Sequence, residues 1–170
     1  MKKLRILSVM FVMTLAICSL TGCNDDENGT GSLTGYVDLG LPSGTKWKSA
    51  NETGGHLGLY TFDEAVNTFG DKLPSKEQLN ELRAYCLWEW DGSGYKVTGT
   101  NDKSIRLPAA GVYSPEDDET YYIGTCGNYW SFTTGDWGGW YLCFYSDNDV
   151  YVTDGDFNEG ALSVRLVKKP

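Results

Sequence analysis

The stretch Trp140-Tyr141-Leu142-Cys143-Phe144-Tyr145 decides the fold, because six successive aromatic or apolar residues favour a β-strand. Similar short runs, bounded by Gly, Asp, Asn or Ser, lie on both sides of it and predict further strands. These runs occupy residues 95–98, 104–107, 129–132, 150–153 and 163–167. We therefore expect the second half of the chain to form a mainly antiparallel, twisted sheet.

The first half of the chain predicts two short strands, at residues 36–39 and 46–48, followed by two helices. Thr61 is placed to cap a helix that runs to about Phe69. Ser75 and Gln78 have the spacing of a capping box and open a second helix. The apolar side of that helix is expected to contain Leu79, Leu82, Ala84, Cys86 and Leu87. Two early helices and a late sheet make the expected fold class α+β.

The N-terminus has the pattern of a secretion signal. Positive residues precede an apolar run at residues 6–20, which is shorter than the roughly 20 residues that a membrane-spanning helix needs. The run ends in Leu20-Thr21-Gly22-Cys23, which resembles the box that bacterial lipoprotein-processing enzymes cleave. Residues 1–22 are therefore predicted to be a lipoprotein signal peptide, and Cys23 the acylated N-terminus. An ordinary signal peptide followed by an incidental cysteine is the alternative.

Residues 23–34 are predicted to be an acidic, Gly- and Ser-containing tether between the lipid and the folded domain. An acidic run directly after the lipidated cysteine, here Asn24–Asn28, resembles the export signal that sends some lipoproteins to the outer face of the outer membrane. The expected location is therefore the outer membrane with the domain exposed at the cell surface. The periplasmic side is the alternative.

The charge of the chain excludes one class of partner. Removal of residues 1–22 takes away three of the 14 Lys and Arg residues and none of the 23 Asp and Glu residues, which leaves a net charge of −12. Nucleic acid is not an expected partner, because few cations are available to neutralise phosphates. There is no basic stripe either, so the lipid anchor is the only expected contact with the membrane.

The residue types needed for the common enzyme mechanisms are scarce. His56 is the single histidine, which rules out a His-based zinc cluster, and Cys86, Cys126 and Cys143 lack the spacing of zinc ligands. Three cysteines leave at least one thiol without an internal partner, and Cys126 with Cys143 is the favoured pair if a disulfide forms. No enzymatic activity is expected, although paired carboxylates on an acidic surface are neither shown nor excluded.

Residues 104–167 predict a binding surface. This segment holds 13 of the 23 aromatic residues, no lysine and ten acidic residues. Aromatic side chains offer large stiff faces to a ligand, and acids or amides can pair with hydroxyl groups. The predicted ligand is a glycan or a protein, and the alternative function is a structural or adhesin-type envelope subunit. The predicted binding residues are Trp137, Trp140, Tyr145, Asp147, Asn148, Asp149, Tyr151, Asp154, Asp156 and Asn158.

No cofactor is expected, although one segment resembles a calcium loop. Asp154, Asp156 and Asn158 occupy the first, third and fifth positions of such a loop, but Glu159 replaces the required glycine and Arg165 the final glutamate. Residues 147–149 could still share calcium with Asp154 or Asp156 across a hairpin. The alternative is that these are turn residues on an acidic surface.

Seven segments in a fixed order resemble the Fibrobacter succinogenes major paralogous domain family. They cover about residues 36–168 and are Tyr36–Trp47, Leu73–Gln78, Cys86–Trp90, Gly94–Gly99, Ile105–Gly111, Tyr129–Ser131 and Leu162–Val167. The segment from Ala50 to Tyr60 is shorter than is usual, and Leu79 stands where tryptophan is common. The resemblance implies that residues 35–170 form a C-type-lectin-like domain, related to formylglycine-generating enzymes, whose C-terminal strands and loops expose a ligand surface. It implies no established activity.

Overall fold

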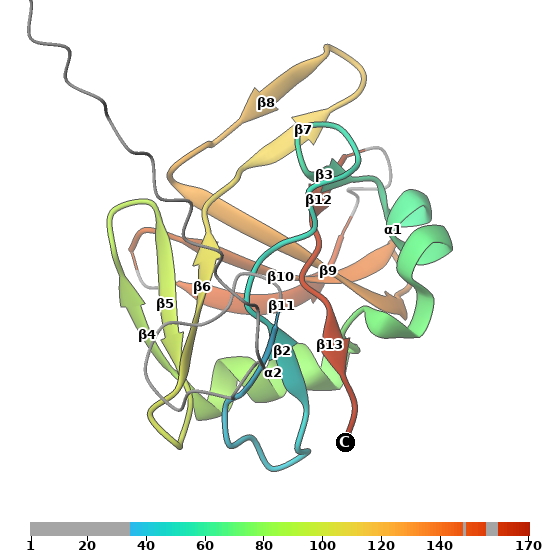
Figure 1. Ribbon diagram of the computed structural model, residues 1–170. Helices are drawn as coiled ribbons and strands as arrows, with labels where there is room; N and C mark the ends of the chain where they lie inside the picture. The colour runs from blue at the N-terminus through green and yellow to red at the C-terminus, as the bar shows by residue number, and fades with distance from the viewer. Residues whose placement is uncertain (1–34, 148, 156–159) are drawn as a thin grey trace, which may run out of the picture.

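The computed structural model, which describes residues 35–147, 149–155 and 160–170, has a five-stranded sheet near its centre (Figure 1). Neighbouring strands of this sheet pair antiparallel, except for one parallel bridge between β9 and β12. The order across the sheet is β11 (Val150–Asp154), β10 (Gly139–Tyr145), β9 (Cys126–Thr134), β12 (Leu162–Ser163) and β3 (Leu59–Tyr60). The aromatic run at 140–145 therefore forms an interior strand, flanked by β9 and β11.

Three smaller sheets surround the central one. One contains β1 (Tyr36–Asp38), β2 (Lys46–Lys48) and β13 (Val167–Lys168), and another contains β4 (Leu87–Trp90), β5 (Gly94–Thr98) and β6 (Ser104–Pro108). The third is a hairpin of β7 (Val112–Ser114) and β8 (Glu119–Tyr121), which projects at the top of Figure 1.

The helices begin where the sequence predicts. Thr61 and Ser75 each cap a helix with a complete capping box, and the helices are α1 (Phe62–Phe69) and α2 (Lys76–Tyr85). A short 3-10 turn, η1 (Gly70–Lys72), lies between them. The expected apolar side of α2 is too long, however. Cys86 has an extended backbone, and the chain continues at once into strand β4, where Leu87 is exposed.

The two faces of the central sheet pack against different cores. Side chains alternate across a strand, so Leu142 and Phe144 of β10 point to one face while Tyr141 and Cys143 point to the other. The first face packs on α2 and on the β5–β6 hairpin, with Leu79, Leu82, Tyr95 and Leu107 in contact. The second face carries Trp130 and packs on residues of the α1 region such as Ala65 and Leu73.

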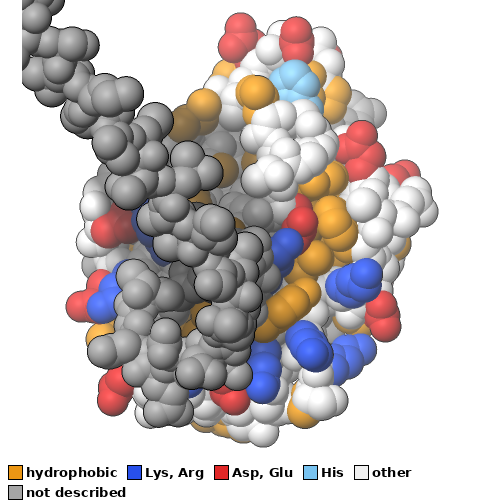
Figure 2. Space-filling view, in the orientation of Figure 1, with side chains coloured by type: hydrophobic (Ala, Val, Ile, Leu, Met, Phe, Trp, Pro, Cys, Tyr) orange, Lys and Arg blue, Asp and Glu red, His pale blue; other side chains and the backbone are white. Residues whose placement is uncertain are grey.

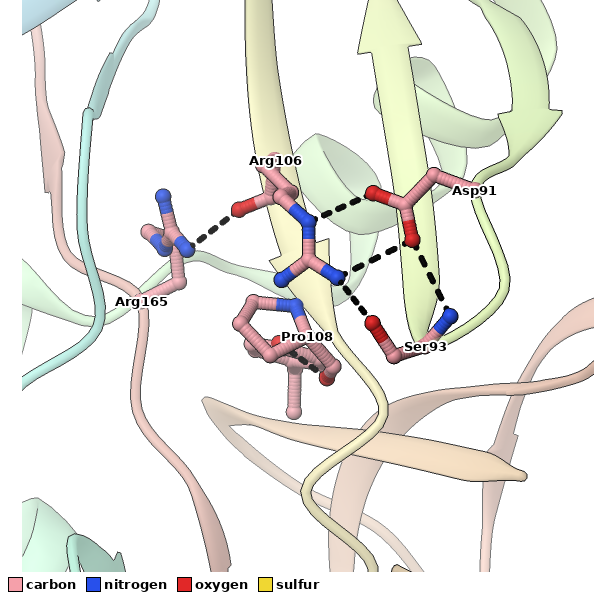
Figure 3. A network of polar contacts seen from close by, with 6 residues as sticks. Asp91, Ser93, Arg106, Pro108 and Arg165 are labelled. Carbon is pink, nitrogen blue, oxygen red and sulfur yellow. Dashed lines mark hydrogen bonds and ion pairs between the residues drawn. The ribbon is translucent and has the colours of Figure 1, made fainter. Parts of the chain in front are cut away.

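A buried arginine connects the small sheets. The Arg165 side chain is 1% exposed and donates hydrogen bonds to the backbone oxygens of Lys48 in β2 (2.8 Å) and Arg106 in β6 (2.7 Å). Its Nε and Nη2 also donate to Asn51 Oδ1 at 2.9 and 2.6 Å. Figure 3 shows the contact with Arg106, whose own guanidinium turns outward to Asp91 and Ser93. Burial lowers the pKa of Arg165 from its ordinary value.

The molecular surface is acidic overall, but cations gather on one part of it. Figure 2 shows Lys and Arg side chains grouped low on the face that it presents. Lys46 and Lys168 stand opposite each other in the register of β2 and β13. Within the described ranges, no helix is both long enough and apolar enough to cross a membrane.

The structure confirms the α+β class, the two early helices and the mostly antiparallel pairing. The expectation of one sheet is wrong, because the strands in the described part of the chain form four sheets. The stretch 163–167 does not form one strand but contributes to β12 and β13, which belong to different sheets. Strands β3, β4, β7 and β8 were not predicted. Two or three residues are too few to show a pattern in β3, β7 and β8, and the start of β4 was assigned to the second helix.

Candidate functional site: a tyrosine-lined cavity

A cavity of about 360 Å³ lies between the β7–β8 hairpin and one face of β9, β10 and β11. We call it the tyrosine cavity because six tyrosines line it: Tyr113, Tyr121, Tyr122, Tyr141, Tyr145 and Tyr151. Strand alternation explains the grouping, since Tyr141 and Tyr145 are four positions apart on β10 and so point to the same face. Tyr151 of β11 stands opposite Cys143 in the register and so shares their face.

Two cysteines and an asparagine line the inner part of the tyrosine cavity. Cys126 is opposite Tyr145 and Cys143 is opposite Asn128, so the two cysteines are diagonal neighbours on β9 and β10. Both are buried free thiols that hydrogen-bond each other. The favoured Cys126–Cys143 disulfide is therefore not formed. Diagonal residues are about 7–8 Å apart between Cα atoms, whereas disulfides usually need less than about 7 Å.

The hydrogen bonds of the two thiols shift their pKa values in opposite directions. The bond from Cys143, followed by the bond from Asn128, lowers the pKa of Cys126 to about 7 against the opposing effect of burial. Asn128 Nδ2 lies 3.1 Å from Cys126 Sγ. The same thiol–thiol bond, together with burial, raises the pKa of Cys143 well above its ordinary value. Cys126 is thus the thiol that ionises first, and Cys143 is its hydrogen-bond donor.

Tyr141 and Tyr151 remain neutral donors over the physiological pH range. Burial raises the pKa of Tyr141 to about 12. Burial also raises the pKa of Tyr151, and its hydrogen bond with Cys143 raises it further. Hydroxyl groups of this kind can donate to a ligand or accept from one.

The side chain of Asn128 carries a buried acceptor with no partner. Asn128 is 1% exposed and lines the cavity, and its Oδ1 has no hydrogen-bond partner among the described residues. An unsatisfied buried acceptor costs about 1–3 kcal/mol, so native proteins rarely keep one. A bound molecule that donates a hydrogen bond at this point would remove that cost.

The β7–β8 hairpin forms the outer wall and is held by local contacts. Tyr113 OH donates to Asp118 Oδ1 (2.9 Å), and Tyr121 OH donates to Asp117 Oδ2. The ring of His56 stacks on Tyr113 with 3.9 Å between centroids, which gives this loop histidine a packing role. Gly111 enters the hairpin with φ +78°, and a Cβ there would lie 2.1 Å from the backbone oxygen of Tyr121. Only glycine fits at that position.

The predicted binding residues are divided between two places. Tyr145 and Tyr151 line the tyrosine cavity. Trp137 lies 72% exposed in the turn between β9 and β10, at the other end of β10. Beside that end, Trp140 packs under Lys76, whose Nζ is 3.4 Å from the ring centroid, and Asp154 accepts a hydrogen bond from the backbone of Asp136.

The acidic residues of the calcium hypothesis that the structure describes, Asp147, Asp149 and Asp154, do not converge. Asp147 accepts a hydrogen bond from the backbone of Asp149 in the β10–β11 turn. Asp154 lies at the far end of β11, which at about 3.3 Å per residue is roughly 13 Å from the start of that strand. Among the described residues, no three His, Cys, Asp or Glu side chains are grouped to hold a metal. Asn148, Asp156, Asn158, Cys23 and the segments 1–22 and 23–34 lie outside the described residues.

Much of the tyrosine cavity was not identified from the sequence. The omitted residues are Val112, Tyr113, Ser114, Pro115, Glu116, Tyr121, Tyr122, Cys126, Asn128, Tyr141, Cys143 and Gly160. The sequence does indicate one part of the cavity. Tyr141, Cys143 and Tyr145 occupy alternate positions of a predicted strand, so their side chains must share one face. The contribution of the hairpin had no such signal.

The tyrosine cavity, with its paired thiols and its unsatisfied amide oxygen, is the feature of the described residues that best suits a ligand. Small-molecule sites are usually concave, mostly apolar and equipped with a few polar groups. Comparison with protein-family models, with curated proteins and with solved structures gives no match for this chain.

Proposed function

We propose that this protein is a non-enzymatic, lipid-anchored module that binds a ligand at the outer surface of the cell, and that the tyrosine cavity is its binding site. The observation that supports this most directly is the buried Oδ1 of Asn128 in a preformed cavity, to which none of the described residues donates a hydrogen bond. The lipid anchor and the surface location rest on the pattern around Cys23 and on the acidic tether that follows it.

A C-type-lectin-like domain of the Fibrobacter succinogenes major paralogous family is the proposed finer fold. The ordered segments support it, and the α+β architecture with two early helices is compatible with it. In that reading the C-terminal strands and loops carry the ligand surface. The tyrosine cavity involves β9, β10 and β11, which are in that part of the chain.

The chemistry of the lining favours a neutral sugar unit as the ligand. Tyrosine rings present flat faces on which a sugar ring can pack, and a sugar hydroxyl is a suitable donor to Asn128 Oδ1. The described lining contains Glu116 and no Lys, Arg or His, so an anionic sugar is disfavoured. A volume of about 360 Å³ is near the lower limit of small-molecule pockets, which suits a terminal glycan unit better than a long chain.

A protein partner is the second candidate, and one observation favours it. Tyr121, Tyr122 and Ile123 are 44%, 65% and 66% exposed beside the cavity. Exposed aromatic and apolar residues next to one another are typical of protein interfaces. Such a partner would make the chain a structural or adhesin-type envelope subunit, and it would co-purify as a stable subunit.

The test is a screen of neutral glycans against the full chain, followed by titration of tyrosine and tryptophan fluorescence. Asn128→Leu removes the acceptor without a large change in volume, and it should weaken binding about 2- to 10-fold, the effect of one hydrogen bond. The free energy of unfolding should fall by less than the binding free energy does, because the substitution also removes the unsatisfied Oδ1 of Asn128.

Trp137→Ala is the matched control, because it alters the other end of β10 and should leave binding unchanged. Binding that survives Asn128→Leu and disappears in Trp137→Ala would move the site to the Trp137 end of the sheet. Binding to no glycan, together with a stable co-purifying protein, would favour the second candidate.

A further inference from the structure

The paired thiols of the tyrosine cavity have no part in the proposed reversible binding. Cys126 and Cys143 are hydrogen-bonded to each other, and the Asn128 amide donates to Cys126 Sγ from 3.1 Å. Both cysteines line the tyrosine cavity. A thiol that receives two hydrogen bonds at the wall of a cavity is placed to react, because hydrogen bonds stabilise its thiolate.

We propose that Cys126 is a covalent exchange site, which forms a mixed disulfide with small cationic disulfides that enter the tyrosine cavity. In this step the Cys126 thiolate attacks one sulfur of a disulfide R–S–S–R. The bond between Cys126 Sγ and that sulfur forms while the original S–S bond breaks. The second sulfur leaves as R–S⁻ and takes a proton from water. Cys126 is oxidised and one half of the ligand is reduced, so no other oxidant is needed.

Cys126 and Cys86 differ in environment in a way that predicts which one reacts. Cys86 is half-buried and more accessible than Cys126, which is 2% exposed. However, burial raises the pKa of Cys86 to about 11, and nearby Glu81 contributes to the rise. The pKa of Cys126 is lowered and that of Cys86 is raised, so at pH 7 a much larger fraction of Cys126 than of Cys86 is thiolate. Lower basicity weakens a thiolate nucleophile by only about threefold per pKa unit, whereas the thiolate fraction changes about tenfold per unit, so Cys126 should still react first.

The register predicts that the mixed disulfide accumulates. Cys143 is the diagonal neighbour of Cys126, and diagonal Cα atoms lie about 7–8 Å apart, beyond the usual limit for a disulfide. Cys143 also stays protonated, since its pKa is raised by its bond with Cys126 and by burial. Cys143 is therefore a positioning residue that donates a hydrogen bond, not the thiol that displaces the ligand.

The preference for a cationic ligand follows from the charges around the cavity. Glu116 lines it, and Asp117 and Asp118 follow in the same hairpin turn. Among the described lining residues none is basic, and the whole chain carries a formal charge of −9. An acidic surrounding raises the local concentration of cations and lowers that of anions. The inferred exchange reaction goes beyond the proposed function. It uses the same cavity, but it does not require that the cavity binds a glycan.

The experiment compares three disulfides of similar size with the full chain at pH 7. They are cystamine (cationic), bis(2-hydroxyethyl) disulfide (neutral) and 3,3′-dithiodipropionate (anionic). Acid-quenched samples are analysed by intact mass and by peptide mapping, and each rate is divided by the rate of the same disulfide with N-acetylcysteine. We expect labelling first at Cys126, and a normalised rate for cystamine about tenfold above that for the anion.

Variants separate the site from the rest of the molecule. Cys126→Ser should abolish the fast adduct, Cys86→Ser should leave it unchanged, and Cys143→Ala should slow it because a hydrogen-bond donor is lost. First labelling at Cys86, equal normalised rates for the three disulfides, or an internal Cys126–Cys143 disulfide would each overturn the inference. If a variant folds poorly, the order in which Cys126 and Cys86 are labelled in the wild-type chain still tests the inference. A failed glycan screen leaves these outcomes unaffected, so the two proposals fail separately.

Discussion

Replacement of Arg165 by methionine tests whether one buried side chain holds three parts of the fold together. The change removes four hydrogen bonds and leaves three acceptors without their donor, namely Asn51 Oδ1 and the backbone oxygens of Lys48 and Arg106. Each unsatisfied acceptor costs about 1–3 kcal/mol when buried. These contacts are only partly buried, so we take the lower value for each and expect a loss of about 3 kcal/mol.

That loss is a large part of the 5–15 kcal/mol that typically stabilises a domain. Urea unfolding followed by tryptophan fluorescence measures it. With a slope of about 2 kcal/mol per molar urea, the midpoint should fall by roughly 1.5 M. Arg165→Lys should recover little of the loss, because an ammonium cannot reach acceptors in three directions as the planar guanidinium does.

Arg106→Met is the matched control. The Arg106 side chain is 44% exposed, and its ion pair with Asp91 lies at the surface. Such pairs contribute about 0–1 kcal/mol, so the control should lower the midpoint by less than about 0.5 M. If Arg165→Met costs less than about 1 kcal/mol, or if the two methionine variants lose equal stability, the connecting role of Arg165 is wrong.

Three further predictions concern the anchor, the tryptophans and the thiols. Cys23→Ala should move the protein from the membrane fraction to the soluble one, and unchanged partitioning into detergent would contradict lipidation. Trp130→Ala should cost about 3–5 kcal/mol in urea unfolding, because Trp130 is fully buried and donates to Tyr60 O at 2.7 Å, whereas Trp137→Ala should cost less than about 0.5 kcal/mol. Alkylation of Cys126 by iodoacetamide, followed by peptide mapping from pH 5 to 9, should rise through about pH 7, since the hydrogen bond from Cys143 lowers its pKa. By the same linkage, the stability that the Cys126 thiolate contributes is present above the pKa of an unfolded thiol and is lost as the pH falls through about 7.

Local signals were sufficient to predict the helices but not the tyrosine cavity. Thr61 and Ser75 act on amide groups within three residues of themselves, so the sequence alone reveals their capping role. The β7–β8 hairpin is different. Its strands have three residues each, and it is fixed in part by backbone bonds between Tyr113 and the distant Ala161. Pairing between segments so far apart leaves no periodic trace in the sequence.

The crowding of aromatic residues identified the right part of the chain but the wrong grouping. Trp137 and Tyr145 were assigned to one surface because they are close in sequence among acids and glycines. The structure places them at opposite ends of β10, with an irregular register between Gly139 and Tyr141. A single-residue irregularity changes which side chains share a face, and composition cannot reveal it.

The pairing of β13 with β2 has a consequence for how the chain reaches its native state. Val167 stands opposite Trp47, so one small sheet is completed by residues near both limits of the described chain. Contacts this distant in sequence are slow to form, because the intervening chain must first be ordered. Trp47, almost fully buried in the finished structure, therefore lacks its cross-strand neighbour Val167 until synthesis has reached β13. A nascent chain that ends before residue 167 would leave one edge of β2 unpaired, so the pairing of β13 is the closing step in the assembly of this sheet.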